Sequence, residues 1–567
     1  MARTEPQVIR FRHPGAGRGT ASASPRGRQV EAGALDEVRA LLGEEPQRRD
    51  LLIEYLHRIQ DHYRCLNVRH LAALAQEIGL AQSEVFETAS FYSHFDIVGE
   101  DEPQPAPITL RVCDSLSCEM AGSGALFEQL SQASSGQARV LRAPCMGYCH
   151  RAPVVAVGRR QIPRASAEAV MRAVAAGETE PEIPFYKGLD AYLDEGGYDL
   201  LGRCLAGRQD LDEIIRALES SGLRGLGGAG FPPGEKWKLV RSEPGPRYMA
   251  VNADEGEPGT FKDRYHLERD PHRVLEGMLI GAWAVEAEAV YIYLRDEYPA
   301  VHELLKTEIA ALEDRGLVPH TRIELRRGAG AYICGEESAM IESIEGKRGL
   351  PRHRPPYVSR AGIFGRPTLV NNVETLYWVR DILERGPDWF VAQGHGDARG
   401  LRSFSVSGRV MDPGLKLAPA GITARALIEE YCGGMGDGHE FLAYLPGGAS
   451  GGILPARLAD LPLDFGSLEH HGSFVGSHAV IVLSDQDDLR RVVLNLMRFF
   501  EDESCGQCTP CRVGTRKAVA MMEQDNWDHG LLEELSRTMA DASICGLGQA
   551  APNPLLCALR YFPEVFG

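Results

Sequence analysis

Four cysteines near the end of the chain constrain its fold more than any other feature of the sequence. Cys505, Cys508 and Cys511 fall within seven residues, and Cys545 follows 34 residues later. Three thiolates this close together wrap the backbone around one corner, and a distant fourth can close the site, which is a common way of holding a [4Fe–4S] cluster. A zinc ribbon uses two separated Cys-x2-Cys knuckles instead. The spacing therefore favours an iron–sulfur cluster over zinc.

A second group of four cysteines lies in the first third of the chain. Cys113 and Cys118 form one pair, and Cys145 and Cys149 form the other. Each pair follows a predicted strand, so two loops at one edge of a small domain can bring four thiolates to one point. Four thiolates suit either Zn²⁺ or a [2Fe–2S] cluster, and the spacing alone does not choose between them. We expect the other five cysteines to be small buried apolar residues: Cys65, Cys204, Cys334, Cys432 and Cys557.

Length and charge narrow the class of protein. A chain of 567 residues is too long for a single core and should divide into several domains. Its formal charge of −18 argues against a general affinity for nucleic acid or anionic lipid. No run of about 18 apolar residues occurs, and the start of the chain lacks the apolar centre of a secretory signal. We therefore expect a cytoplasmic protein, in which thirteen cysteines are not a disulfide framework.

Changes in sequence pattern predict a multidomain protein that combines α+β and α/β parts. Leu52, Leu56 and Ile59 recur at helical spacing, as do Val492 and Leu496 near the end of the chain. Short alternating strands and turn residues mark the parts between. The predicted segments are a disordered basic tail (1–30), a helical domain (31–100), a thioredoxin-like α/β domain (106–180), a layered α/β domain (185–398), a small β-rich domain (401–485) and a C-terminal helical domain (486–567).

A glycine-rich segment at 222–231 contains Gly225-x-Gly227-x-x-Gly230. This pattern indicates a Rossmann dinucleotide site only when a strand precedes it, whereas residues 211–220 have the pattern of a helix. The glycines still permit backbone N–H groups to approach a phosphate closely, and Lys236 could supply a positive charge. The alternative is a flexible surface loop without a ligand.

An acidic loop follows a predicted strand at 248–251. It begins at Asn252 and concentrates Asp254, Glu255 and Glu257 in a few residues. Carboxylates and an amide at a strand end can accept hydrogen bonds from ribityl or ribose hydroxyls and from the edge of a flavin. The alternative is a charged turn with no ligand.

Four segments together resemble the NADH-binding flavoprotein subunit of respiratory complex I and its soluble relatives. They are residues 222–231, 252–263, 332–337 and 370–375. This resemblance covers about 185–567 and ends with the last cysteine group. Residues 35–180 resemble the 24-kDa-type subunit, in which a helical segment precedes a thioredoxin-like [2Fe–2S] ferredoxin. The chain thus resembles a fusion of the two units.

The fusion, together with the segment 345–357, is most similar to the beta subunits of NAD-dependent formate dehydrogenases that contain tungsten or molybdenum. Such a subunit works with a larger catalytic subunit that carries the metal–pterin site and further iron–sulfur clusters. Diaphorase subunits of NAD-reducing hydrogenases share the fusion, and a fused complex I subunit is a third possibility. The non-enzymatic alternative is an assembly subunit whose cysteines bind structural zinc and which has no redox role.

The resemblance implies a division of labour among FMN, NAD(H) and the two clusters. Hydride would pass between NAD(H) and FMN without a catalytic acid–base pair, and single electrons would pass to the [4Fe–4S] cluster, with the [2Fe–2S] cluster as a side store. The residues implied for FMN are Gly225, Gly227, Gly228, Lys236, Asn252, Asp254, Glu255, Tyr332, Gly335, Glu336, Val370, Asn371, Asn372 and Thr375. Those implied for NAD(H) are Phe231, Lys236, Glu257, Glu337, Arg354 and Tyr357. The β-rich segment would be a β-grasp-like, soluble-ligand-binding-like insert.

Three positions depart from the pattern of this family. Leu226 stands where an arginine is usual, Leu239 where an aromatic residue can stack on adenine, and Arg354 where a lysine can occur. The first two put the local contacts in doubt but leave the glycines in place. We also expect Glu337 to disfavour the 2′-phosphate of NADPH through like-charge repulsion.

Overall fold

The computed structural model describes residues 28–44, 46–134 and 136–566. The predicted basic tail therefore lies outside the described residues, apart from residues 28–30. The N-terminal helical part packs as a small bundle around Leu52, Leu56 and Ile59, which are fully buried. Its elements are α1 (Ala32–Leu42), η1 (Arg49–Leu51), α2 (Leu52–Tyr63), α3 (Val68–Glu77) and α4 (Gln82–Phe91), with the short pair β1 (Leu66–Asn67) and β2 (Ile97–Val98).

The next part is a four-stranded sheet of order β4-β3-β5-β6 with helices packed on it. Its strands are β3 (Ile108–Cys113), β4 (Ala138–Ala143), β5 (Val154–Val157) and β6 (Arg160–Pro163), and its helices are α5 (Leu116–Met120), α6 (Ser123–Ala133), η2 (Cys149–Arg151) and α7 (Ala167–Ala176). The first two strands are parallel, and the others are antiparallel to their neighbours. Strand β6 was not predicted because its residues are only half-buried and show no alternation.

A fully parallel sheet of order β10-β7-β8-β9 forms the centre of the molecule. Its strands are β7 (Arg247–Ala253), β8 (Ala287–Leu294), β9 (Arg322–Arg327) and β10 (Thr368–Asn372). The helices are α8 (Leu189–Asp194), α9 (Asp199–Leu205), α10 (Leu211–Ser221), α11 (Pro233–Ser242), α12 (Lys262–Arg269), α13 (Pro271–Val285), α14 (Pro299–Asp314), η3 (Tyr332–Gly335), α15 (Glu337–Ile344), η4 (Ile363–Gly365), α16 (Val373–Tyr377), α17 (Val379–Arg385) and α18 (Pro387–Val391). Strand β8 is almost continuously apolar and buried, as expected of a strand covered on both faces.

The β-rich part is a mixed sheet of order β12-β11-β15-β13-β14. It contains β11 (Leu401–Gly408), β12 (Gly414–Pro419), β13 (Phe441–Leu445), η6 (Ala449–Gly451), β14 (Leu454–Pro455), η7 (Ala456–Leu458), η8 (Glu469–His471) and β15 (Ala479–Ser484). Its helical stretch is a short α19 (Ala424–Ala426) that continues as the π-helical turn η5 (Leu427–Tyr431). A π-helical turn contains more residues than an α-helical turn, so apolar residues at α-helical spacing do not reveal it.

Helices close the chain. They are α20 (Leu489–Asp502), α21 (Thr509–Met522), α22 (His529–Ala542), α23 (Gly546–Ala550), α24 (Asn553–Tyr561) and α25 (Pro563–Phe566). Helix α20 buries Val492, Val493 and Leu496 on one face, as the sequence predicts. Within the described ranges, no helix has both the length and the apolar character needed to cross a bilayer.

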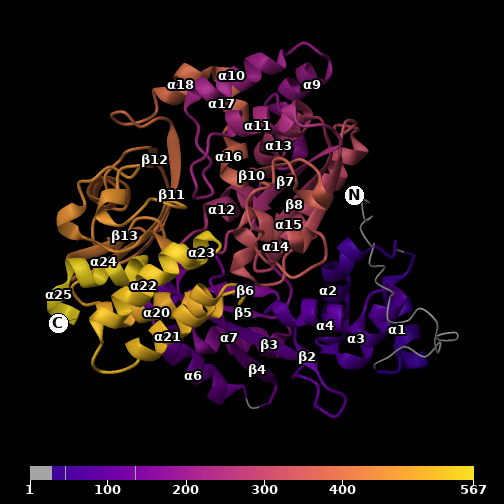
Figure 1. Cartoon of the computed structure of the whole chain (residues 1–567), viewed down its shortest axis with the longest axis horizontal. Helices are drawn as coiled ribbons and strands as arrows, with labels where there is room; N and C mark the ends of the chain where they lie inside the picture. The colour runs from indigo at the N-terminus through magenta and orange to yellow at the C-terminus, as the bar shows by residue number, and fades with distance from the viewer. Residues whose placement is uncertain (1–27, 45, 135, 567) are drawn as a thin grey trace, which may run out of the picture.

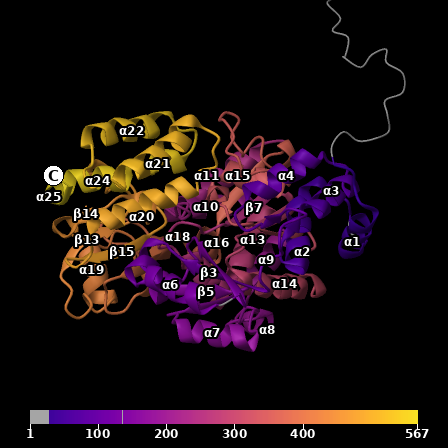
Figure 2. The ribbon, with the colours of Figure 1, turned by 90° about the horizontal axis from the view of Figure 1, so that it is seen from below.

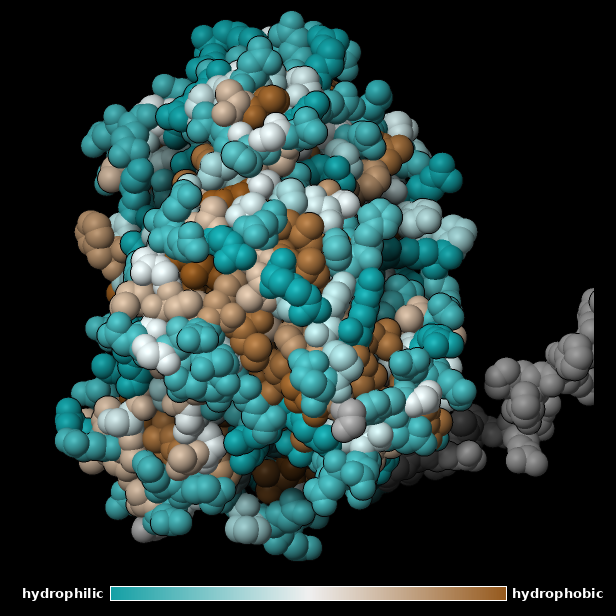
Figure 3. Space-filling view, turned by 90° about the vertical axis from the view of Figure 1, so that its left-hand side faces the viewer, coloured by the Kyte–Doolittle hydropathy of each residue, from teal (hydrophilic) through white to brown (hydrophobic). Residues whose placement is uncertain are grey.

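Figure 1 shows how these parts are arranged. The N-terminal bundle lies at one side of the parallel sheet and the β-rich part at the other, while the thioredoxin-like part and the C-terminal helices lie below. In the perpendicular view the C-terminal helices and the thioredoxin-like helices α6 and α7 form opposite edges (Figure 2). The face that carries the β-rich part is mostly hydrophilic, with apolar residues gathered across its middle (Figure 3). The predicted fold class, multidomain α+β and α/β, is confirmed.

Candidate functional site

A cavity of about 550 Å³ lies at the carboxyl ends of β7 and β10. This end of a parallel sheet is where open α/β folds bind ligands, because loops of several strands converge there. The predicted site residues that line it are Gly227, Gly228, Asn252, Asp254, Glu255, Glu257, Tyr332, Gly335, Glu336 and Asn372. The cavity thus brings the glycine loop and the acidic loop together.

The other predicted site residues do not line this cavity. They are Gly225, Phe231, Lys236, Glu337, Arg354, Tyr357, Val370, Asn371 and Thr375. Asn371 and Asn372 are neighbours on strand β10, so their side chains point to opposite faces. Asn371 accepts a hydrogen bond from Trp237 Nε1 at 3.0 Å in the core behind the sheet. We therefore assign Asn371 to the support of the strand rather than to contact with a ligand in the cavity.

The glycine-rich loop connects α10 to α11, so no strand precedes it and the site is not of Rossmann type. Gly225 N–H donates to the carbonyl of Phe231, which closes the loop on itself. A Cβ on Gly227 would lie 3.0 Å from Cβ of Asn372, so a side chain there would push the two loops apart by a few tenths of an ångström. Leu226 is fully buried, and its backbone N–H donates to Thr375 Oγ1 at 2.9 Å. The leucine in place of the usual arginine therefore belongs to the core.

Asp254 provides the observation that most directly tests whether this cavity fits a ligand. Its Oδ2 is buried and has no hydrogen-bond partner among the described residues. Burial raises the pKa of this carboxyl well above its usual range. A buried polar atom without a partner is costly, and a ligand that offers hydroxyl or N–H donors removes the cost. The ribityl hydroxyls and ring edge of a flavin offer such groups, so the residues present fit FMN.

The carboxylate of Glu255 is already used inside the protein. It accepts hydrogen bonds from the backbone N–H groups of Asp263 and Arg264 at 2.8 and 3.1 Å and from Tyr298 Oη at 2.9 Å. Burial and the nearby Asp263 carboxylate raise the pKa of Glu255 to about 7. Glu255 thus fixes the acidic loop to the start of α12 while it lines the cavity.

Glu257 joins the parallel-sheet part to the β-rich part. One carboxylate oxygen accepts hydrogen bonds from both the backbone N–H and the hydroxyl of Ser450 at 2.7 Å. The other accepts a hydrogen bond from Tyr332 Oη. Burial raises the pKa of Glu257 although these donors oppose it. The carboxylate therefore positions Tyr332 at the wall of the cavity.

Lys262 is a cavity residue that the site prediction missed. Its side chain is 1% exposed, and its Nζ lies 2.8 Å from Asp263 Oδ1 and 3.3 Å from Glu374 Oε2. Burial lowers the pKa of Lys262, but the carboxylates of Asp263 and Glu374 outweigh it and the pKa is raised. Lys262 lies within the 252–263 segment that carries the family resemblance, so the sequence could have identified it as a site residue. It gives the cavity a fixed positive charge.

Parts of the chain far from the glycine loop also line the cavity. The β-rich part contributes Ser450, Phe474, Gly476 and Ser477, and the C-terminal helices contribute Gly546, Leu547, Gln549, Ala550 and Asn553. None of these was predicted. They are more than 200 residues from the glycine loop along the chain, and no local pattern marks them.

Of the residues predicted for NAD(H), Glu257 lines the cavity itself, and the other five form a rim outside it. Arg354 pairs with Glu337, with Nη2 to Oε1 at 3.0 Å, and with the cavity residue Glu336. Phe231 and Tyr357 are 42% and 57% exposed. Burial lowers the pKa of Lys236, and the charge of Glu337 opposes this shift. The rim thus offers two exposed aromatic rings, and the charge of Glu337 is partly balanced by Arg354.

Cys113, Cys118, Cys145 and Cys149 come together and are all buried. The sulfur atoms of Cys145 and Cys149 lie 3.3 Å apart. The acidic loop reaches this group, because Phe261 packs against Cys145 and Cys149. The four-thiolate group and the cavity therefore share one loop.

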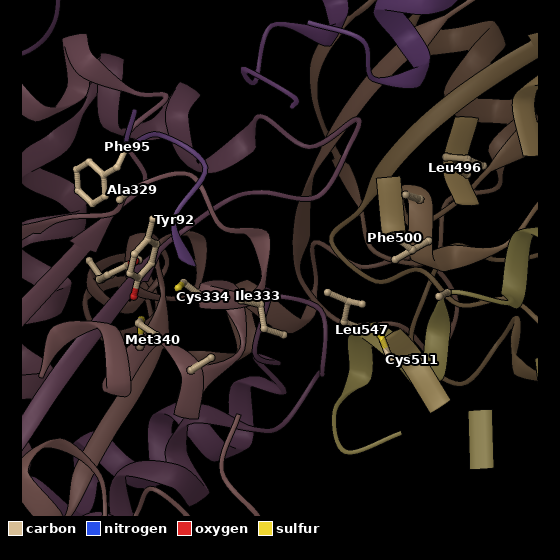
Figure 4. Packing of buried hydrophobic residues seen from close by; sticks show 14 of the residues in the cluster. Tyr92, Phe95, Ala329, Ile333, Cys334, Met340, Leu496, Phe500, Cys511 and Leu547 are labelled. Atoms are coloured by element: carbon tan, nitrogen blue, oxygen red, sulfur yellow. The ribbon is translucent and has the colours of Figure 1, made fainter. Parts of the chain in front are cut away.

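Cys505, Cys508, Cys511 and Cys545 also come together, at the other side of the cavity. Backbone N–H groups of Leu547 and Gly548, at the start of α23, donate toward the sulfur of Cys545. Leu547 lines the cavity and lies beside Cys511 (Figure 4). Leu547 thus contacts both the cavity and this four-thiolate group. The five other cysteines are buried, as predicted.

The fold and the site define a flavin- and iron–sulfur-containing oxidoreductase subunit, with its flavin cavity between two cluster sites. Three family models match the chain. They describe a Nuo51 FMN-binding domain over residues 218–381, an iron–sulfur binding region of NADH-ubiquinone oxidoreductase-F over 491–567 and a thioredoxin-like [2Fe–2S] ferredoxin over 38–177. The last match resolves the choice between zinc and [2Fe–2S] at the first cysteine group in favour of the ferredoxin type.

Similar proteins agree with this class. An F-type subunit of the NADH-quinone oxidoreductase of Rhizobium meliloti is 41% identical over 68% of this chain and 95% of its own length. The HndC subunit of the NADP-reducing hydrogenase of Solidesulfovibrio fructosivorans is 38% identical over 67% of this chain and 80% of its own length. A solved NAD⁺-reducing [NiFe]-hydrogenase chain is 33% identical, with a TM-score of 0.80 over 92% of this chain and 94% of that chain. The chain belongs to the family of NADH-dehydrogenase-type flavoprotein subunits, as the sequence resemblance implied.

Proposed function

We propose that the chain is the diaphorase subunit of a larger complex, exchanging hydride between NAD(H) at the rim and FMN in the cavity. The observation that carries this proposal is the position of the cavity. Its wall contains the buried, unpartnered Oδ2 of Asp254, and it is also lined by Leu547, which packs against the Cys505–Cys545 group. FMN bound there would supply the conversion between two-electron hydride exchange and one-electron transfer.

The residues of the chain would hold and orient the two ligands. Gly227 and Gly228 would admit the phosphate-bearing end to close backbone contact, and Asp254 would accept a hydrogen bond from a ribityl hydroxyl. Lys262 would supply a fixed positive charge. Phe231 and Tyr357 would stack against NAD(H) at the rim. Hydride exchange needs no proton donor or acceptor side chain, so the chain contributes position and electrostatics.

The two cluster sites would serve different electron paths. The cavity and the [4Fe–4S] site share helix α23, so this cluster is the natural exit toward a partner subunit. The [2Fe–2S] site contacts the acidic loop on the opposite side and would act as a side store. The purified subunit should reduce artificial dyes with NADH but should not oxidise formate. Formate oxidation by the subunit alone would contradict this assignment.

For the partner, we propose a larger subunit of a formate dehydrogenase, with a tungsten- or molybdenum-containing pterin site, in the cytoplasm. The resemblance of the fusion and of segment 345–357 supports this choice. The test is to purify the complex from its source and to identify the large subunit and its metal. Tungsten or molybdenum, together with formate-dependent reduction of NAD⁺, is the expected result.

A second candidate is the diaphorase subunit of an NAD-reducing hydrogenase. It is favoured by the solved NAD⁺-reducing [NiFe]-hydrogenase chain, which is similar over 92% of this chain and so includes both fused units. The same purification separates the two candidates. Nickel in the large subunit and hydrogen-dependent reduction of NAD⁺ would replace the formate assignment while leaving the diaphorase function in place.

A further inference from the structure

Two histidines and an aspartate meet where the N-terminal bundle packs against the parallel-sheet part. His57 and Asp61 are four residues apart on α2 and so lie on one face of that helix, while His94 follows α4. One possible ligand atom from each residue lies within 4.8 Å of the others. None of the three residues belongs to either cysteine group or to the flavin-cavity loops.

His57 presents an unused nitrogen in this group. The residue is 3% exposed, and its Nε2 lies 2.8 Å from the carbonyl oxygen of Gly328. A carbonyl only accepts, so Nε2 carries the proton and Nδ1 has the free lone pair. Nδ1 is buried and has no hydrogen-bond partner among the described residues. A buried lone pair without a donor calls for a ligand.

His94 is held as metal-binding histidines usually are. Its Nδ1 lies 2.6 Å from Asp296 Oδ2, and Arg327 holds the other oxygen of that carboxylate, with Nε to Oδ1 at 2.6 Å. A carboxylate that receives one N–H of a histidine fixes its tautomer and leaves the second nitrogen as the donor to a metal. The backbone N–H of His94 also bonds to the carbonyl of Ala329 at 3.1 Å, which fixes the loop.

The charges in direct contact with the group favour a cation, and the group is open to solvent on one side. Asp61 and Asp296 contribute two negative charges, whereas Arg327 contributes one positive charge, with Nη1 at 2.6 Å from Asp61 Oδ2. The group therefore has a net charge of −1 when the histidines are neutral. Asp61 is 43% exposed, and together with His94 it lines a cavity of about 430 Å³, whose lining also includes four further acidic residues and six arginines, Arg327 among them. An ion and its remaining water ligands can enter from that side.

We propose that His57, Asp61 and His94 bind a Zn²⁺ ion that joins the N-terminal bundle to the parallel-sheet part. Two imidazoles and one carboxylate, with open positions for water, match the preferences of this ion. The loop 328–330 packs against the site, and Phe95 lies beside Ala329 (Figure 4). Tyr332 of the flavin cavity follows in the same segment. The ion thus stabilises a junction that leads directly to the cavity wall.

The test uses the full chain with both cysteine groups filled with iron, incubated with ZnCl₂ and then freed of loosely held metal. We expect one retained zinc per chain, a rise in the midpoint of thermal unfolding, and a zinc X-ray absorption spectrum with only N/O ligands at about 2.0–2.1 Å. Sulfur ligands at about 2.3 Å would show that zinc occupies the cysteine groups, which would overturn the proposal.

Three variants locate the ion. His57→Gln, His94→Gln and Asp61→Asn should each weaken zinc binding by about tenfold or more. His62→Gln, an exposed histidine on the same helix, is the matched control and should bind zinc as the natural protein does. Because Asp61 is partly exposed, its variant should fold even if His57→Gln does not. Zinc binding that survives both Asp61→Asn and His94→Gln, or no retained zinc in the natural protein, overturns the assignment.

Discussion

Lys262 is the residue whose charge is most deeply embedded at the flavin cavity. Its ammonium group faces Asp263 and Glu374, and all three side chains are at most 4% exposed. Removing one partner of such a group leaves the others as uncompensated buried charges. Lys262 therefore stabilises the cavity wall and also contributes to the electrostatic potential inside the cavity.

We predict that Lys262→Met lowers the free energy of unfolding of the flavin-binding part by about 3–5 kcal/mol. FMN content should fall with it. Denaturant unfolding followed by flavin fluorescence measures the first effect, and released flavin measures the second. Lys306→Met is the control, because Lys306 is 65% exposed and its ion pair with Glu303 spans 3.8 Å. A loss below about 1 kcal/mol for Lys262→Met would contradict the role assigned to it.

Glu337 is the residue we expect to set the preference for NADH. Its carboxylate contacts Arg354, so Glu337→Gln removes a negative charge and also frees a guanidinium for the 2′-phosphate of NADPH. We predict that kcat/KM for NADPH rises about tenfold, equivalent to ~1.4 kcal/mol, with little change for NADH. The double variant Glu337→Gln, Arg354→Gln should lose most of that gain. Steady-state kinetics with both nucleotides checks this, and an unchanged NADPH rate in Glu337→Gln would exclude the idea.

At the level of elements, α23 connects the cavity to the second cysteine group. The helix is short and begins at Gly546, directly after Cys545, which we propose as a cluster ligand. A Cβ on Gly548 would lie 2.5 Å from Ser543 Oγ and 2.8 Å from Cβ of Cys511, whereas a Cβ on Gly546 would meet nothing within 4 Å. The same small helix thus contains one position with no room for a methyl group and one with ample room.

We predict that Gly548→Ala displaces Cys511 from α23 and disrupts the [4Fe–4S] site, while Gly546→Ala leaves it intact. Iron content should fall in the first variant, and the electron paramagnetic resonance signal of the reduced [4Fe–4S] cluster should weaken. The [2Fe–2S] signal should persist in both variants, because its ligands lie in a different part of the chain. Equal iron contents in the two variants would show that this contact tolerates the methyl group.

At the level of the whole molecule, a buried arginine joins the N-terminal bundle to the parallel sheet. Arg326 at the end of β9 is 2% exposed, and its guanidinium lies 2.8 Å from Asp50 Oδ2 and 3.3 Å from Glu54 Oε1. It also contacts Glu324 on its own strand at 2.6 Å. Arg48 also pairs with Asp50 and Glu324, but its side chain is 39% exposed, so Arg326 is the buried cation among these three carboxylates.

Arg326→Met should therefore loosen the N-terminal bundle without unfolding the sheet. The cost of breaking such a pair, about 3–5 kcal/mol, corresponds to an increase of about 100-fold or more in amide hydrogen exchange of α2. Arg315→Met is the control, since its pair with Asp190 is exposed on both sides. Hydrogen-exchange mass spectrometry measures both. Exchange of α2 that matches the control would mean that apolar packing alone holds the junction.

Much of the fold and of the cluster chemistry was predictable because it depends on local spacing. Helical periodicity identified α2 and α20, and the helix before the glycine loop excluded a Rossmann site. The cysteine spacings identified both four-thiolate groups, since ligands close in sequence must share a loop. Strand β6 was missed because its residues show no regular apolar period.

The sequence by itself determined which chemical groups this protein brings to its site: eight thiolates, a glycine loop and an acidic loop. Only the tertiary structure decided how they are used. In the folded chain, Asn371 points into the core and Asn372 toward the cavity. The carboxylate of Glu255 accepts hydrogen bonds from backbone N–H groups of the protein. The tertiary structure also brought Ser450 and Leu547 to the cavity wall. Contacts between residues hundreds of positions apart form only when the domains pack, so no local pattern encodes them.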